Sequence, residues 1–200
     1  MSIQPINCFA YYYFDIETVP LLQYVRDEQA SFDPSMAKVI TIQYQKLDIR
    51  TGDPISDLII LKEWDSSSSE RSIVEQFKQI FIDDGIWAFI PVGNNLLFEC
   101  RFMKYKLKQY CNIDDLHIGH RPMIDLKHIL VIMNEGKFRG CAELIGKTGR
   151  ARNMAQWYTS KNYDMIQQYI IQEARDFTTF YSALKKELPK MRYHISCILP

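Results

Sequence analysis

Apolar and polar residues follow two different periods along this chain, and together they predict a mixture of strands and helices. Runs rich in aromatic and β-branched residues predict strands over residues 10–18, 38–47, 58–64, 86–92 and 118–124. The turn at 51–54 should join the second and third strands, which makes the first three an antiparallel meander. The fourth run is almost wholly apolar up to Pro91, as expected of a strand buried on both faces.

Apolar residues at helical spacing occupy most of the remaining chain. They predict helices over residues 70–82, 97–111, 125–133, 139–145 and 164–188. Serines 66–69 offer N-caps for the first of these helices, and Pro189 is expected to end the last one. Residues 147–162 are polar, basic and aperiodic, which predicts a loop or lid. The order of elements indicates one α/β domain with a mixed sheet flanked by helices.

The composition narrows this picture. With 200 residues, 47% of them hydrophobic, we expect one domain over 1–200, with a core at about 9–188 and a C-terminal tail at 189–200. Twenty-four basic and 24 acidic residues give no overall charge that would favour nucleic acid or an anionic membrane. Five scattered cysteines argue against a disulfide framework and fit a reducing cytoplasm. No run of eighteen apolar residues predicts a membrane span, and no signal peptide is expected.

Candidate chemistry begins with two acids in the first strand, Asp15 and Glu17. Side chains at i and i+2 of a strand point to the same face, so these two carboxylates should project together. On a buried strand their mutual repulsion and desolvation are costly, and a bound cation would remove both penalties. The alternative is that the strand ends at Asp15 and both acids are solvated.

A third acid, Glu173, lies in the middle of the apolar stripe of the last predicted helix. A carboxylate on a buried face should be paired, protonated or bound to a metal. Tyr169 is one turn earlier on the same face, so its hydroxyl should reach the same place. A small rotation of the helix would instead leave Glu173 in solvent.

Glu99 should also lean inward, at the start of the helix that follows the buried strand. An acid in a first turn is stabilised by the helix dipole, so a purely structural role is the alternative. Together the four carboxylates would suit Mg²⁺ or Mn²⁺, whereas the chain has only four scattered histidines for a zinc site. Two such ions can activate a water and stabilise the leaving oxygen of a phosphodiester.

Three patches of sequence resemble the motifs of the DnaQ-like (DEDD, Tyr-type) 3′–5′ exonuclease superfamily, in particular the exonuclease domains of B-family DNA polymerases and their free-standing relatives. Residues 14–20 are similar to its D-x-E motif, residues 92–99 to its N-x-x-F-D motif, and residues 169–173 to its Y-x-x-x-D motif. The resemblance covers about residues 9–185 and implies a ribonuclease H-like fold. In the family, Asp stands where this chain has Glu99 and Glu173.

The resemblance implies a two-metal hydrolysis that releases nucleoside monophosphates from single-stranded or frayed 3′ ends of DNA, with RNA left open. Asp15, Glu17, Glu99 and Glu173 would hold two Mg²⁺ or Mn²⁺ ions, and Tyr169 would orient or help to deprotonate the attacking water. It further implies contacts with the terminal nucleotide from the backbone around Ile16 and from Thr18, Asn95 and Phe98. The basic segment near Trp157 offers phosphate contacts through Lys147, Arg150 and Arg152, or is a merely solvated loop.

Two other functions stay open at this point. The longer acids at positions 99 and 173 could weaken a metal site, since Mg²⁺ demands near-ideal octahedral geometry. The chain would then be a weakened exonuclease-fold protein that binds nucleic acid or a protein partner without cleaving. A structural α/β domain with solvated acids is the third alternative. A polymerase or repair protein is a candidate partner, and the sequence leaves the oligomeric state open.

Overall fold

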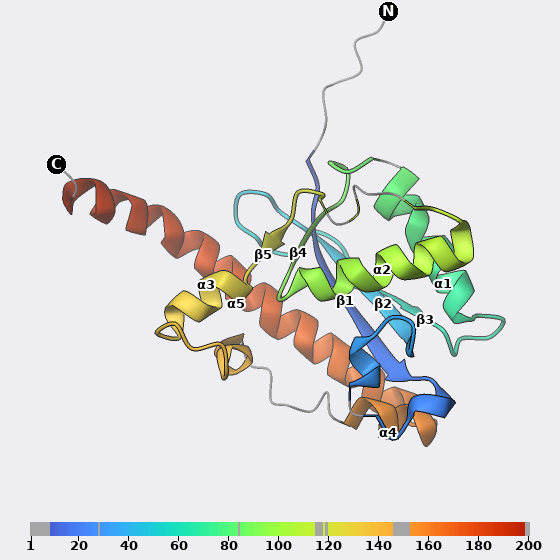
Figure 1. Ribbon diagram of the computed structural model, residues 1–200. Helices are drawn as coiled ribbons and strands as arrows, with labels where there is room; N and C mark the ends of the chain where they lie inside the picture. Colours follow the sequence, from blue (N-terminus) through green and yellow to red (C-terminus); the bar gives the residue numbers. More distant parts are fainter. Residues whose placement is uncertain are drawn as a thin grey trace, which may run out of the picture.

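The computed structural model describes residues 9–27, 29–83, 85–114, 118, 120–145 and 153–198 of the chain. Its centre is a five-stranded mixed sheet in the order β3-β2-β1-β4-β5 (Figure 1). The strands are β1 (Tyr11–Pro20), β2 (Ala37–Leu47), β3 (Ile59–Lys62), β4 (Ile90–Gly93) and β5 (Ile124–Asp125). The predicted α/β fold, with an antiparallel meander and parallel strands in one sheet, is confirmed.

The strand β1 is central, and its side chains divide between the two faces of the sheet. The ring of Phe14 stacks on Phe77 of α1 with centroids 5.1 Å apart, while Tyr13 contacts Phe177 of α5 at 5.2 Å. Because strand side chains alternate, Asp15 must follow Tyr13 toward the α5 face. This alternation decides where the acids of β1 point.

A β-bulge interrupts the pairing of β1 with β2 directly after Glu17. Glu17 pairs with Thr41 and Thr18 with Val39, so Ile40 is the extra residue of β2. A bulge bends its strand and re-aims the side chains around it. Here Ile40 is fully buried against the α5 side of the sheet, in a cluster with Val19, Met154, Ile166 and Ile170 that we call the α4/α5 cluster.

The parallel strands are shorter than their apolar runs predicted. The strand β4 begins at Ile90 rather than at residue 86, because Ile86 and Trp87 lie in a turn and are partly exposed. Pro91 does not end β4, which continues to Gly93. Of the predicted strand at 118–124, the described residues form a strand only at Ile124–Asp125.

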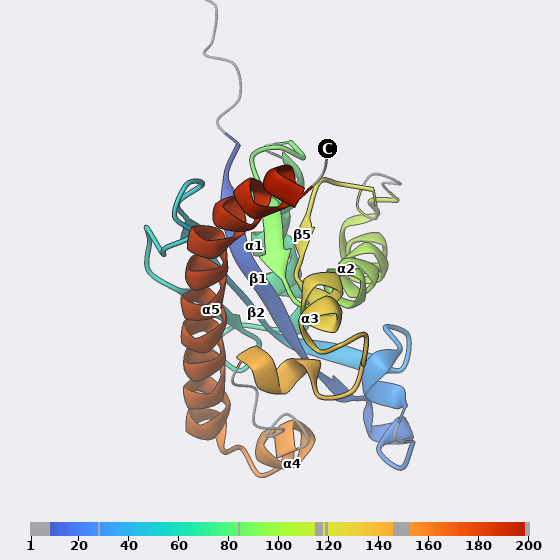
Figure 2. The same ribbon diagram turned by 90° about the vertical axis from the view of Figure 1, so that its left-hand side faces the viewer.

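Helices cover both faces of the sheet (Figure 2). They are α1 (Glu70–Lys78, continued as a π-helical turn to Asp83), α2 (Leu96–Cys111), α3 (Lys127–Met133), α4 (Met154–Thr159) and α5 (Tyr163–Ile198). The helices α1 and α2 share one core with Phe14 and Ile16, whereas α5 shares another with Tyr13. Ser69 is the N-cap of α1, in a capping box with Ser72, as the serine run predicted.

Two predictions about the C-terminal third were wrong. Within the segment predicted as a loop, residues 154–159 form α4, which is anchored by the buried Met154 but is too short to show a helical period. Pro189 lies inside α5 and does not stop it. A proline inside a helix removes one backbone hydrogen bond and kinks the axis, and Figure 2 shows that α5 bends toward its C-terminal end.

Short 3₁₀ turns complete the connections: η1 (Leu22–Tyr24) and η2 (Ala30–Phe32) follow β1, and η5 (Cys141–Ile145) follows α3. Where residues 139–145 predicted an α-helix, the structure has this 3₁₀ turn. Within the described residues, no helix is long and apolar enough to span a lipid bilayer.

Candidate metal centre

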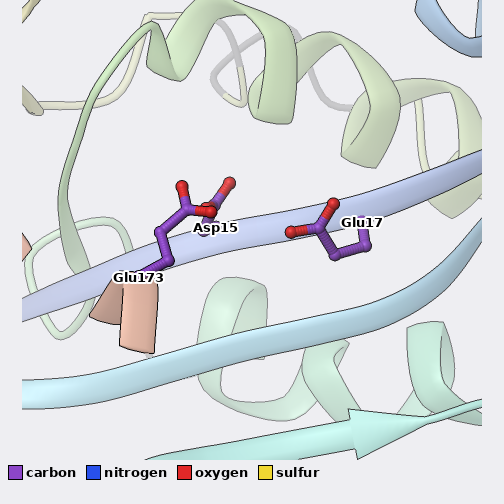
Figure 3. Close-up of side chains that lie close together, drawn as sticks. All are labelled: Asp15, Glu17 and Glu173. Atoms are coloured by element: carbon purple, nitrogen blue, oxygen red, sulfur yellow. The ribbon is translucent and has the colours of Figure 1, made fainter. Parts of the chain in front are cut away.

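Three acids from two distant parts of the chain converge at one place. Asp15 and Glu17 come from the α5 face of β1, and Glu173 comes from α5. One ligand oxygen of each lies within 4.8 Å of those of the other two. Figure 3 shows the Glu17 carboxylate turned along the strand toward the adjacent carboxylates of Asp15 and Glu173. We call these three residues the acid triad.

Glu173 lies where its helical position predicted. It is 7% exposed, and Ile166, Ile170 and Phe177 on the same stripe of α5 are buried as well. Leaving a carboxylate there requires polar or ionic compensation, because burial of a bare charge is costly. Asp15 and Glu17 are partly buried. The acid triad thus lies between a sheet and a helix and is not a fully solvated surface cluster.

Tyr13 is part of this site, although the sequence reasoning did not single it out. Its hydroxyl is 3.4 Å from Oδ2 of Asp15, while Oδ1 of Asp15 accepts a 2.9 Å hydrogen bond from the backbone N–H of Ile16. Burial raises the pKa of Tyr13 well above its usual value, and the charges of Asp15, Glu173 and Glu17 add to the shift. Tyr13 lies two residues before Asp15 on the same face of the strand. The i, i+2 spacing that pointed to Asp15 and Glu17 could therefore have pointed to Tyr13 as well.

Tyr169 stands one helical turn before Glu173 and acts as a hydrogen-bond donor. Burial raises its pKa far above the ordinary value, followed by the charges of Glu173 and Glu17 and by a side-chain hydrogen bond with Glu173. A tyrosine in this environment keeps its proton at neutral pH. The ring of Trp157, on α4, lies 6.2 Å from the Tyr169 ring and supports it from the side.

The donor atoms of the acid triad fit a hard divalent cation. All three ligands are carboxylate oxygens, which suit Mg²⁺ and Mn²⁺ better than the softer ions that prefer histidine and cysteine. Three negative charges this close together repel one another, and a cation between them would reverse that repulsion. The buried position of Glu173 makes this compensation more valuable than it would be at an exposed site.

Glu99 does not join the acid triad. It is 5% exposed, so the predicted inward orientation is confirmed, but it is not among the described acids whose ligand atoms gather within 4.8 Å. The helix α2, which carries Glu99 in its first turn, packs on the face of the sheet opposite to α5 (Figure 2). Burial raises the pKa of the neighbouring Cys100 thiol to about 12, with the Glu99 charge as the next largest cause.

Asn95 is held by residues that the sequence reasoning did not connect with it. It caps α2 in a left-handed conformation, φ 71°, and its backbone N–H donates to Asp125 at 2.8 Å. Lys127 donates to its side-chain oxygen at 2.6 Å, and the same Asp125 oxygen accepts from the Lys127 backbone. Gly93 allows this close turn, because a Cβ there would come within 2.9 Å of the Phe14 carbonyl oxygen.

The other predicted contact residues have diverse positions. Thr18 follows the bulge and donates its hydroxyl to the Ser31 carbonyl at 2.8 Å. Phe98 lies in the first turn of α2, and its ring is 4.7 Å from that of Phe102. Arg150 and Arg152 lie outside the described residues, as does Lys147.

Comparison with known proteins gives a likeness of fold. No protein-family model matches this sequence, and no curated protein matches it. The zinc-ion-bound E. coli ExoI–ssDNA complex shares a TM-score of 0.57 at 10% identity, over 94% of this chain and 43% of that one. Apo exonuclease I has a TM-score of 0.48 at 9% identity, over 66% of this chain and 32% of that one. Exonuclease I from Methylocaldum szegediense has a TM-score of 0.45 at 13% identity, over 66% of this chain and 31% of that one.

The chain therefore spans less than half the length of these solved structures. The likeness to the ExoI–ssDNA complex shows that the chain has the ribonuclease H-like α/β fold. At this identity it shows the fold alone, so the chemistry must be argued from the acid triad.

Proposed function

We propose that this chain is a metal-dependent 3′–5′ exonuclease that hydrolyses single-stranded or frayed 3′ ends of DNA, with RNA as the second candidate substrate. The observation that carries the proposal is the acid triad itself, in which Asp15, Glu17 and Glu173 come within 4.8 Å of one another between β1 and α5. The fold shared with the ExoI–ssDNA complex agrees with this chemistry. The motifs around these residues resemble those of the Tyr-type branch near the B-family polymerase exonucleases, and this resemblance supports the proposal.

Asp15, Glu17 and Glu173 would hold a Mg²⁺ or Mn²⁺ ion, and Glu99 is the remaining acid for a second ion. Such an ion lowers the pKa of a bound water and offsets charge on a phosphodiester. Tyr169 is protonated at neutral pH like any tyrosine, and burial raises its pKa further, so its hydroxyl would turn its hydrogen bond from Glu173 toward the reacting phosphate or water. In this proposal Tyr169 orients the reactants and does not deprotonate the water.

Substrate contacts would come from the residues that the motif resemblance implies and from their neighbours. Thr18, the backbone of Ile16, and Asn95 with its partner Lys127 offer polar groups for a terminal nucleotide. Phe98 offers a ring for its base, and Arg150 and Arg152 offer charge for phosphates. A polymerase or repair protein remains the candidate protein partner for a domain of this kind.

The decisive experiment is a nuclease assay with 5′-labelled single-stranded DNA and RNA in Mg²⁺, in Mn²⁺ and in EDTA. We expect 3′ shortening that needs a divalent ion, and a loss of at least about 100-fold in Asp15→Asn, since removing one electrostatic group costs that much. Asp57→Asn is the matched control, because Asp57 is exposed on the β2–β3 connection. A folded wild-type protein that shortens no 3′ end in either metal would refute the proposal.

A second function is favoured by one observation, the position of Glu99 outside the acid triad. If the three acids gathered among the described residues do not suffice for catalysis, the chain would bind nucleic acid or a protein partner without cleaving. Oligonucleotide binding without turnover would support this alternative. In that case Glu99→Asp combined with Glu173→Asp, which restores the shorter acids, should raise activity in Mg²⁺.

A further inference from the structure

Tyr13 occupies a fixed place in the sheet, directly before the acids of β1. It is paired with β2 on one side and with β4 on the other. The pairing of β1 with β4 covers Tyr11 to Tyr13, so Asp15 lies two residues beyond its end. Tyr13 is 2% exposed, in the core that β1 shares with α5. Its hydroxyl is therefore held by a rigid part of the strand, next to an acid that has one strand fewer beside it.

The side chain of Tyr13 contacts both elements that carry the acid triad. Its hydroxyl donates to Oδ2 of Asp15 on β1 at 3.4 Å, which is long for a hydroxyl and a carboxylate. Its ring packs on Phe177 of α5, one helical turn after Glu173, with centroids 5.2 Å apart. Burial raises the pKa of Tyr13, and the charges of the acid triad raise it further. The hydroxyl thus lies close enough to all three acids to be affected by their charges.

Both oxygens of the Asp15 carboxylate accept hydrogen bonds from the chain. Oδ1 accepts from the backbone N–H of Ile16 at 2.9 Å, and Oδ2 accepts from Tyr13. Donors on both oxygens limit the rotation of a carboxylate. Groups that hydrogen-bond to metal ligands orient them in this way, and their loss typically weakens metal binding about 10- to 100-fold. Of the two donors, the hydroxyl is the one that depends on which side chain stands at its position.

We propose that Tyr13 is a positioning residue of the cation site, and that its hydroxyl holds the Asp15 carboxylate in the direction that binds a divalent cation. This inference rests on the proposed function, in which the acid triad binds such an ion. Tyr13 orients a ligand and takes no part in bond breaking. If it merely filled the core between β1 and α5, its ring would suffice, and the hydroxyl could be removed without effect on the site.

The test compares Mn²⁺ binding by two variants that each lose one buried hydroxyl. Tyr13→Phe keeps the ring, and we expect it to raise the Kd for Mn²⁺ about 10- to 100-fold, measured by the EPR signal of free Mn²⁺. Tyr181→Phe is the matched control, because Tyr181 is also 2% exposed and stacks on the same Phe177 ring, with centroids 6.3 Å apart. Its Kd should change less than about 2-fold. Urea unfolding in EDTA checks that both variants are folded.

A second measurement uses the wild-type chain and so does not depend on the folding of a variant at position 13. In protein labelled with ¹³C at the tyrosine Cζ atoms, saturating Mg²⁺ should shift the signal of Tyr13, because the ion binds the carboxylate to which its hydroxyl donates. The signal of Tyr181 should stay in place. A Tyr13 signal that does not move while Mg²⁺ binds would overturn the positioning role.

The outcomes separate this inference from the proposed function. If the wild type shortens 3′ ends but Tyr13→Phe binds Mn²⁺ as tightly as the wild type or more tightly, the positioning role is refuted and the exonuclease stands. If Tyr13→Phe weakens Mn²⁺ binding but the wild type shortens no 3′ end, the exonuclease fails and the positioning role stands. Equal weakening by Tyr181→Phe would point to general packing and overturn the inference, as would a wild type that binds no Mn²⁺.

Discussion

Glu173 carries two energetic costs that a solvated acid avoids. It is almost fully buried, and its carboxylate lies within 4.8 Å of those of Asp15 and Glu17. At that separation two like charges repel by about 1 to 3 kcal/mol, for an effective dielectric between that of water and that of a protein surface. A bound cation would offset both costs.

This balance predicts opposite effects of Glu173→Gln with and without metal. In EDTA the variant should be more stable than the wild type by about 1 kcal/mol, because one repelling charge is gone. At Mn²⁺ concentrations of about 100 times Kd the wild type should gain about 2.7 kcal/mol, and the variant much less. Urea unfolding followed by circular dichroism measures both.

The control for this experiment is Glu187→Gln, on the same helix, where the acid is exposed and pairs with Lys190. Its unfolding free energy should change by less than about 0.5 kcal/mol in either buffer. A loss of stability in EDTA for Glu173→Gln would mean that protein donors, rather than a missing cation, compensate the buried charge.

Single residues could be predicted from the sequence where a regular period surrounded them. Glu173 stood out because its helical neighbours were apolar, and Tyr13 could have been found from the same strand face as Asp15. The position of Glu99 could not be foreseen, since it depends on how α2 packs in the folded chain.

At the scale of elements, a buried ion pair joins α2 to α1 and β2. Lys106, 3% exposed, contacts Oε1 of Glu70 at 2.9 Å and donates to the Ala37 carbonyl at 2.8 Å. Glu70 in turn accepts hydrogen bonds from the Val39 backbone at 2.7 Å and from the Tyr110 hydroxyl at 2.7 Å. The network fixes α1 and α2 against the start of β2.

Breaking this network should be far more costly than breaking a surface pair. We expect Lys106→Met to lower the free energy of unfolding by about 3 kcal/mol or more, because Glu70 is left buried without its cation. Lys108 is on the same helix as Lys106 and forms an exposed ion pair with Asp114. Lys108→Met should lower the free energy of unfolding by less than about 1 kcal/mol. Equilibrium denaturation in urea compares the two, and equal losses would contradict a structural role for the buried pair.

Element boundaries followed the sequence where local signals agreed with packing. Ser69 capped α1 as expected, and β2 began one residue before its predicted start. The apolar run at 86–89 misled because residues 86–88 form a turn, in which the Ala88 N–H donates to the Gly85 carbonyl at 3.2 Å. Pro189 misled because one lost hydrogen bond is tolerable in a helix held by the packing of its earlier turns.

At the scale of the whole molecule, α5 is the longest element and extends past the body. Figure 1 shows its C-terminal part projecting away from the sheet. The described α5 side chains in the hydrophobic clusters run from Tyr163 to Leu184, and Leu188 and Met191 are exposed. The earlier part of the helix therefore supports the fold and the acid triad.

Removal of residues 189–200 should accordingly leave the core folded. We expect the thermal midpoint to fall by less than about 4 °C, the effect of roughly 1 kcal/mol in a domain of this size. A chain that ends after Asp176 lacks Phe177 and Tyr181 and should not fold. Thermal melts by circular dichroism test both, and unfolding of the longer truncated chain would show that the projecting turns carry stability.

The bulge of β2 also constrains the length of this protein over evolution. Deleting Ile40 would align every remaining residue of β2 with β1 in one regular ladder, which is the simpler sheet. It would also remove the one described side chain that β2 contributes to the α4/α5 cluster, behind the helix that carries Glu173. Insertions and deletions in this strand are thus limited by packing on the same face of the sheet as the acids, because the irregular pairing places Ile40 there.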